Sequence, residues 1–243
     1  MASASAALPV LASPDTRVDR YTPGMIEVVA VNVGVPRLLG RRQGGNVYSG
    51  IAKQPVPAGT VVWLSLVNLA GDGQADLSVH GGPDKAVYSY PSDHLPGWEA
   101  DLGEELGTAP FGENLSTRGV LESDVCIGDR WRWDHAVLEI CQPRWPCFKL
   151  ALYHGRGDVQ TLMRTSGRTG WYLRVIEPGE VTVGTPIELI HRDPARLSVH
   201  DAHLAMADRS LENRDLVERL AHHARLAAGW RDPLDQRLAG HEG

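Results

Sequence analysis

The chain has 243 residues, of which 42% are hydrophobic and 22% are charged, and its formal net charge is −6. This composition excludes wholesale disorder, and the acidic balance argues against a dedicated nucleic-acid-binding protein. No apolar run approaches the ~20 residues of a transmembrane helix, and three cysteines do not form a disulfide framework. We therefore expect a cytoplasmic protein with no membrane or nucleic-acid partner.

The first twenty residues, 1–20, are rich in Ala, Ser and Pro and lack a basic segment, which predicts a disordered tail rather than a signal peptide. Beyond them, short β-branched and aromatic runs alternate with Gly, Pro and Asp turns. We expect strands at 25–31, 60–66, 87–90, 130–133, 136–140 and 186–190, helices at 91–102 and 159–164, and a loop at 40–45. Residues 21–194 are therefore predicted to form a mainly β domain, a barrel or a sandwich, with a few short helices.

The pattern changes near Pro194. Ser198 and Asp201 have the spacing of a helix capping box, with Asp in place of Glu or Gln. We expect helices after Ser198, over 212–226 and over 234–238, with a break at Gly229 and Pro233. Residues 195–243 are thus predicted to form a small C-terminal helical domain of two or three helices.

Cys147 is the first candidate for chemistry, in the segment QPRWPCFKL at 142–150. The two prolines exclude a helix there and fix the backbone around the cysteine. Arg144 and Lys149 bring positive charge that favours a thiolate, which is a nucleophile or a soft metal ligand. A small hydrophobic residue packed under a loop is the alternative.

A glycine loop, HGGPDKA at 80–86, is the second candidate. Gly81 and Gly82 allow backbone conformations that bring N–H groups to a polar or anionic ligand. His80 and Lys85 add a titratable ring and a cation. An ordinary tight turn is the alternative.

A turn with polar side chains, FGENLST at 111–117, is the third candidate. Glu113 and Asn114 offer a carboxylate and an amide suited to the edge of a heterocycle. Asx-type turn chemistry is the alternative. The segment GDGQAD at 71–76 resembles part of a calcium loop but lacks the complete ligand pattern.

Other residues are assigned to packing or to the surface. Cys126 and Cys141 lie in apolar runs and are predicted to be structural. His200 and His203 share a helical face without further metal ligands, and we expect them on the surface. The sequence contains no GxGxxG, Walker, GxSxG or HExxH motif and no CxxC pair.

Three segments in succession resemble the MOSC-domain family, and in particular its YiiM-like subgroup. They are DLSVHGGPDKAVYSYP, FGENLSTRGVLESDVCIGDRWRW and AVLEICQPRWPCFKL, and LMRTSGRTGWYLRVIEPGEV and the helical tail continue the resemblance. The resemblance covers about residues 25–240. It implies a β-barrel-like fold with a C-terminal three-helix domain.

The resemblance also implies binding of the molybdenum cofactor (molybdopterin), with Cys147 as the molybdenum ligand. Arg144, Lys149 and Lys85 are then candidates to bind the cofactor phosphate, with Ser49 as a further site residue. Gly81, Gly82, Glu113 and Asn114 would complete the cofactor site.

The activity implied is reduction of N-hydroxylated compounds, such as purine analogues, to amines. His80 is then a candidate proton donor. The sequence has no flavin or nicotinamide signature, so electrons are expected from a separate reductase. Because Gly229 and Pro233 interrupt the last helix, docking of that reductase on the helical domain is not predicted. The oligomeric state stays open, with a homodimer among the alternatives.

Two other functions stay open at this point. One is a sulfur carrier or sulfurtransferase with a persulfide on Cys147, and the other is a cofactor-binding protein without turnover. The reductase hypothesis predicts that Cys147, His80 and Asn114 meet in one pocket.

Overall fold

The computed structural model describes residues 24–76 and 81–240. The expected tail at 1–20 and the predicted site residue His80 lie outside this range. Among the described residues, no helix combines the length and apolar character needed to cross a membrane.

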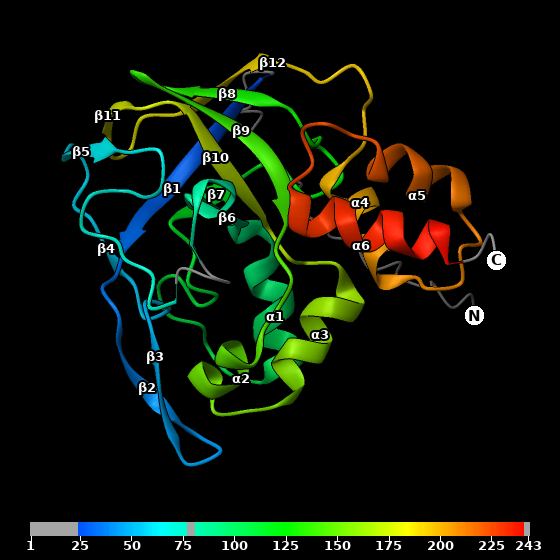
Figure 1. The fold of residues 1–243 in the computed structure, drawn as a ribbon. Coiled ribbons are helices and arrows are strands. Elements are labelled where there is room, and N and C mark those ends of the chain that lie inside the picture. The colour runs from blue at the N-terminus through cyan, green and yellow to red at the C-terminus, as the bar shows by residue number, and fades with distance from the viewer. Residues whose placement is uncertain (1–23, 77–80, 241–243) are drawn as a thin grey trace, which may run out of the picture.

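A closed β-barrel forms the body of the protein (Figure 1). Within the described residues, seven strands close it in the order β12-β8-β9-β10-β6-β7-β1, with β1 pairing back to β12. These strands are β1 (Met25–Val33), β6 (Val87–Pro91), β7 (Leu115–Arg118), β8 (Arg130–Trp133), β9 (Ala136–Pro143), β10 (Trp171–Glu177) and β12 (Ile187–His191). All the pairings are antiparallel except β6 with β7.

Burial along the barrel strands follows from what covers each face. In β8 the tryptophans point into the barrel while the arginines point outward, the alternation expected of a half-covered strand. Every residue of β6 and β9 is buried, because helices cover their outer faces. The mainly β barrel fold predicted from the sequence is confirmed.

Smaller strands extend the barrel. They are β2 (Arg37–Arg42), β3 (Gly45–Ser49), β4 (Gln54–Pro55), β5 (Val61–Leu64) and β11 (Gly179–Thr182). The predicted loop at 40–45 was wrong, because β2 and β3 form a hairpin around Gln43 and Gly44. Both turn residues have positive φ, 50° and 81°, as two-residue hairpin turns require.

Three helices cover one end of the barrel in Figure 1. They are α1 (Leu95–Leu102), α2 (Phe148–His154) and α3 (Asp158–Ser166), with short 3₁₀ turns at Pro83–Lys85 and Ser92–His94. They share a second core with Tyr88, Tyr90 and Phe111. The predicted helices at 91–102 and 159–164 are confirmed, whereas α2 was not predicted.

The remaining helices, α4 (Val199–Ala207), α5 (Arg214–Ala221) and α6 (Ala228–Ala239), pack on the side of the barrel. Their buried apolar residues belong to the same core cluster as the barrel interior. The α4 capping box is confirmed, because the Ser198 hydroxyl accepts from the Asp201 N–H while the Asp201 carboxylate accepts from the Ser198 N–H.

Two helix boundaries in this region differ from the prediction. Helix α5 is shorter than residues 212–226, and the Asn213 side chain caps its start. Helix α6 runs through Gly229 and Pro233, where a break was expected. Trp230, Leu234 and Leu238 recur every fourth residue and are buried, so tertiary packing outweighs the low helix propensity of glycine and proline.

Candidate functional site

Cys147 lies where strand β9 passes into helix α2. Its backbone is extended, with φ −113° and ψ 168°, and its carbonyl accepts the first bond of α2 from the Leu150 N–H at 3.0 Å. The side chain is half-buried. Two cavities meet at this residue, since Cys147, Lys85 and Tyr172 line both of them.

The smaller cavity, of about 90 Å³, brings together most of the predicted cofactor residues. The predicted residues among those lining it are Ser49, Lys85, Asn114, Arg144, Cys147 and Lys149. They come from β3, the 3₁₀ turn before β6, the segment before β7, the β9–α2 connection and the first turn of α2. The barrel therefore collects segments about a hundred residues apart around one thiol.

Two buried cations face this cavity. The Arg144 side chain is 7% exposed and Lys149 is 8% exposed. Arg144 donates to neutral acceptors, the Phe111 carbonyl at 2.6 Å and the Tyr88 hydroxyl at 3.2 Å, and its guanidinium lies over the Tyr88 ring. Within the described residues neither cation forms an ion pair. Buried cations that form no ion pair favour binding of an anion.

Lys53 and Asp72, which the sequence analysis did not assign to the site, also line this cavity. The Asp72 side chain is 2% exposed and forms an ion pair with the Lys53 ammonium. It also accepts from the Gly34 N–H at 2.8 Å and from the Asn114 amide at 2.9 Å. Burial lowers the pKa of Lys53, and the Asp72 charge opposes that shift. The pair holds three loops together but adds no net charge to the cavity.

The Asn114 side chain is used within the protein. Its amide nitrogen donates to Asp72 and to the Asn32 carbonyl, and its oxygen accepts from the Tyr88 N–H at 3.1 Å. It lines the cavity but acts as a bridge between strands. The predicted contact to a heterocycle edge would have to compete with these bonds.

Glu113 is buried behind the cavity and is not among its lining residues. One carboxylate oxygen accepts from the Phe111 N–H and the other from the Ser116 hydroxyl, both at 3.1 Å. Burial raises the pKa of Glu113 to about 6, against the lowering effect of these hydrogen bonds and of Arg144. The carboxyl supports the turn that carries Asn114 and offers little to a ligand.

The glycine loop places Lys85 at the junction of the two cavities. Gly82 has φ 91° and precedes the 3₁₀ turn, and neither Gly81 nor Gly82 lines either cavity. Asp84 forms an ion pair with Arg174 at 2.8 Å, which anchors the turn to β10. Burial lowers the pKa of Lys85.

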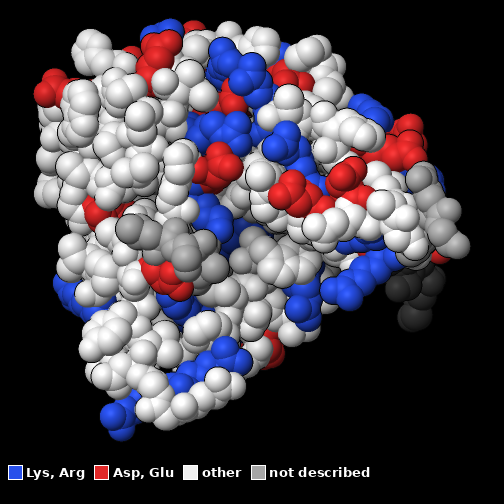
Figure 2. Space-filling view, viewed as in Figure 1, with Lys and Arg blue, Asp and Glu red and all other residues white. Residues whose placement is uncertain are grey.

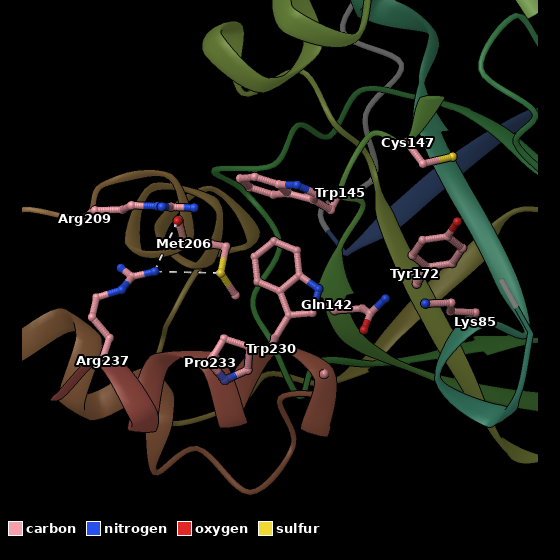
Figure 3. Close-up of a pocket in the computed structure, with 11 residues that line it drawn as sticks. Lys85, Gln142, Trp145, Cys147, Tyr172, Met206, Arg209, Trp230, Pro233 and Arg237 are labelled. Atoms are coloured by element: carbon pink, nitrogen blue, oxygen red, sulfur yellow. Dashed lines mark hydrogen bonds between the residues drawn. The ribbon is translucent and has the colours of Figure 1, made fainter. Parts of the chain in front are cut away.

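A larger cavity, of about 870 Å³, opens on the other side of Cys147. Figure 2 shows a hollow between the barrel and the C-terminal helices, with basic side chains at its floor. The residues that line it are Lys85, Gln142, Trp145, Cys147, Tyr172, Met206, Arg209, Gly229, Trp230, Pro233 and Arg237. The C-terminal helices therefore build one wall of a cavity whose other wall carries Cys147 (Figure 3).

Trp145 joins the cysteine segment to the C-terminal helices. Its ring meets the Trp230 ring edge to face, with centroids 5.9 Å apart, and lies 5.8 Å from the His203 ring. The prediction that His203 lies on the surface was wrong, because it is 2% exposed and its Nε2 lies 2.8 Å from the Arg164 carbonyl. Burial lowers the pKa of His203, so the packed ring favours its neutral form.

The other two cysteines are buried. Burial raises the pKa of Cys141 to about 12, and its thiol donates to the Asp84 carbonyl at 3.2 Å. Burial also raises the pKa of Cys126. Both fit the structural role expected of them, and Cys147 is the cysteine that faces the cavities.

Comparison with known proteins places the chain in a family. The MOSC domain model matches residues 76–188. The chain is 42% identical to the uncharacterized protein YflK of Bacillus subtilis over 204 residues, covering 84% of this chain and 90% of YflK. It is 40% identical to protein YiiM of Escherichia coli, covering 79% of this chain and 86% of YiiM.

A third relative is longer. A protein named "Reductase" from Gibberella moniliformis is 33% identical over 195 residues, which make up 78% of this chain and 34% of that protein. The chain thus spans about a third of that relative.

Solved structures agree with the sequence relatives. The crystal structure of YiiM from Geobacillus stearothermophilus superposes with a TM-score of 0.73 at 31% identity, covering 88% of this chain and 99% of that one. YiiM from Escherichia coli superposes with a TM-score of 0.69 at 30% identity, covering 90% and 94%. On its barrel, its cysteine segment and these relatives, the chain belongs to the MOSC-domain family and to its YiiM-like subgroup.

Proposed function

We propose that this protein binds the molybdenum cofactor at Cys147, with the cofactor phosphate in the smaller cavity, and reduces N-hydroxylated compounds to amines. One observation carries the proposal: the buried Arg144 and Lys149 line a cavity at whose edge lies the Cys147 thiol. The cofactor combines a phosphate with a metal that soft thiolates bind, so this donor set suits it.

Each residue has a defined part in this proposal. The thiolate of Cys147 is the protein's ligand to molybdenum. Arg144 and Lys149 neutralise the phosphate, and the hydrogen bonds to Phe111 and Tyr88 keep the guanidinium pointing into the cavity. The Lys53–Asp72 ion pair positions the loops around them. When bound, the cofactor supplies the two-electron centre that accepts oxygen from an N–OH group.

Lys85 is suited to a proton transfer at the junction of the cavities. Burial lowers the pKa of its ammonium, which makes a proton on Nζ easier to release toward the departing oxygen. His80 stays a second proposed proton donor, outside the described residues. Full turnover in a cofactor-loaded His80→Gln variant would remove it from the mechanism.

Three further points belong to the proposal. The substrate is an N-hydroxylated small molecule, such as a hydroxylated purine. Electrons come from a separate reductase, because the sequence carries no flavin or nicotinamide motif. The relative named "Reductase" supports a redox function for this family branch.

The experiment compares metal content across matched variants. Wild type, Cys147→Ala, Lys149→Gln and the control Cys126→Ala are expressed in a host that makes the cofactor. Molybdenum is measured by elemental analysis, and the released pterin by fluorescence. We expect about one molybdenum per chain in wild type and in Cys126→Ala, loss of the metal in Cys147→Ala, and less pterin in Lys149→Gln.

Two other outcomes would assign the protein to sulfur transfer or to cofactor binding without turnover. Extra sulfur on Cys147 without molybdenum would contradict the proposal in favour of sulfur transfer. Bound cofactor without conversion of an N-hydroxylated purine, supplied with an artificial electron donor, would indicate a cofactor-binding protein without turnover.

A further inference from the structure

The larger cavity exceeds what a small base needs. Its volume of about 870 Å³ lies near the upper end of the roughly 300–1,000 Å³ typical of sites for drug-sized ligands. A single purine ring would leave much of it filled with water. The space therefore suits a ligand with a ring and an additional arm.

The middle section of the larger cavity is lined by aromatic side chains. Trp145 is 40% exposed and, together with Trp230, lines the cavity. The edge-to-face contact with Trp230 holds the Trp145 ring in place. Met206 adds a polarizable sulfur on the side of the C-terminal helices. Such surfaces bind planar heteroaromatic rings by stacking.

The charged side chains that line the larger cavity are positive. Of the described residues that line the cavity, three are cations, Lys85, Arg209 and Arg237, and none is Asp or Glu. The Arg237 guanidinium donates to the carbonyls of Ala205 and Asp208 at 2.7 and 2.6 Å, which fixes it without an ion pair among the described residues. Arg209 is exposed on the loop after α4. Two arginines on one wall favour an anionic group.

Figure 3 gives the order of these features across the cavity. Cys147, Tyr172 and Lys85 lie at one side, Trp145 and Trp230 in the middle, and Arg209 and Arg237 at the other side. We infer that the cavity is a substrate chamber for a planar heteroaromatic ring with an anionic arm, of nucleoside monophosphate size. The hydroxylated ring reaches Cys147, and the C-terminal helices hold the arm.

This inference rests on the proposed function and narrows its substrate from bases to nucleotides. It gives the C-terminal helices a part in substrate selection. A test of binding that needs no turnover separates the two proposals, since adenosine monophosphate carries the ring and phosphate but no N–OH group.

The experiment is calorimetric titration of the protein, as purified from a cofactor-producing host, with adenosine monophosphate and with adenosine. The two probes differ only in the phosphate. We expect the monophosphate to bind about tenfold tighter, because a charge-assisted contact contributes about that factor. Arg209→Gln should remove this preference and leave adenosine binding unchanged. The control is Arg132→Gln, an exposed arginine on β8, which should retain it.

A second variant tests the ring site. Trp145→Leu should weaken both probes by a similar factor, since stacking does not depend on the phosphate. Three results would overturn the inference: equal affinities for the two probes, no binding of either, or a preference lost in Lys149→Gln but kept in Arg209→Gln. The last would place the phosphate in the smaller cavity. Molybdenum measured on the same preparations reports separately on the proposed function.

Discussion

Glu113 shows how burial sets the charge of a single side chain beside the site. Its carboxyl accepts two hydrogen bonds, yet burial raises its pKa from 4.5 to about 6. A raised pKa means that the folded protein binds the proton more tightly than the unfolded chain. The contribution to stability is therefore complete below about pH 4.5 and is lost as the pH rises through 6.

We predict that Glu113→Gln removes this pH dependence. The free energy of unfolding of the wild type should fall by about 2 kcal/mol between pH 4.5 and 7 through this group alone. The neutral glutamine should not show that fall. Urea unfolding at pH 4.5, 5.5, 6.0 and 7.0 measures it. Glu27→Gln, on the exposed face of β1, should keep the wild-type profile. A fall of equal size in Glu113→Gln would contradict the assignment.

Local chemistry could be predicted for the cysteine segment, because Cys147, Arg144 and Lys149 are neighbours in the chain. The Lys53–Asp72 ion pair could not be predicted, because its partners lie 19 residues apart in the chain. In addition, Asp72 belongs to a segment that resembles part of a calcium loop. Asn114 lines the smaller cavity. Its bonds to Asp72 and Tyr88 depend on how the barrel closes, which local patterns do not encode.

At the scale of single elements, the α4 capping box illustrates a signal that is complete within four residues. Ser198→Ala removes the bond from the Asp201 N–H and should lower the free energy of unfolding by about 1 kcal/mol. Urea denaturation measures the change. Ser123→Ala, at an exposed turn, is the control and should leave stability within ~0.5 kcal/mol. An unchanged midpoint in Ser198→Ala would show that the cap contributes nothing.

Helix α6 illustrates a case in which the local sequence signal is overridden by tertiary packing. Pro233 cannot donate the helical bond to the Gly229 carbonyl, so local propensity indicated a break. Burial of Trp230 and Leu234 holds the helix through that point. Both weak helix formers face the larger cavity. The position that misled the local prediction is thus part of the cavity wall.

Gly229 offers a test of this explanation. A Cβ built there meets nothing within 4 Å, so Gly229→Ala should raise the free energy of unfolding by roughly 0.5–1 kcal/mol through backbone entropy. Gly179→Ala, in β11, should instead destabilise, because its Cβ would lie 2.7 Å from the His135 carbonyl oxygen. Thermal unfolding compares both with wild type. Destabilisation by Gly229→Ala would mean that α6 is strained at this point.

For the whole molecule, the strand pattern predicted a mainly β fold, but the pairing of β1 with β12 that closes the barrel joins residues about 160 apart. Pairings of this range carry no local signature. The same holds for the larger cavity, which combines Lys85 from the barrel with Arg237 from α6. Each wall could be predicted as an element, but their juxtaposition required the tertiary structure.

The position of Cys147 between these two walls makes its thiol a built-in reporter of access to the site. Cys126 and Cys141 are buried in the core, so a thiol reagent should reach them only after global unfolding. Cys147 is half-buried and lines both cavities, so a thiol reagent should reach it in the native protein through the larger cavity. Trp230→Leu should widen that route and speed labelling of Cys147 severalfold in native buffer, while leaving the other two thiols protected. Mass spectrometry of the labelled chain would thus report how open the larger cavity is.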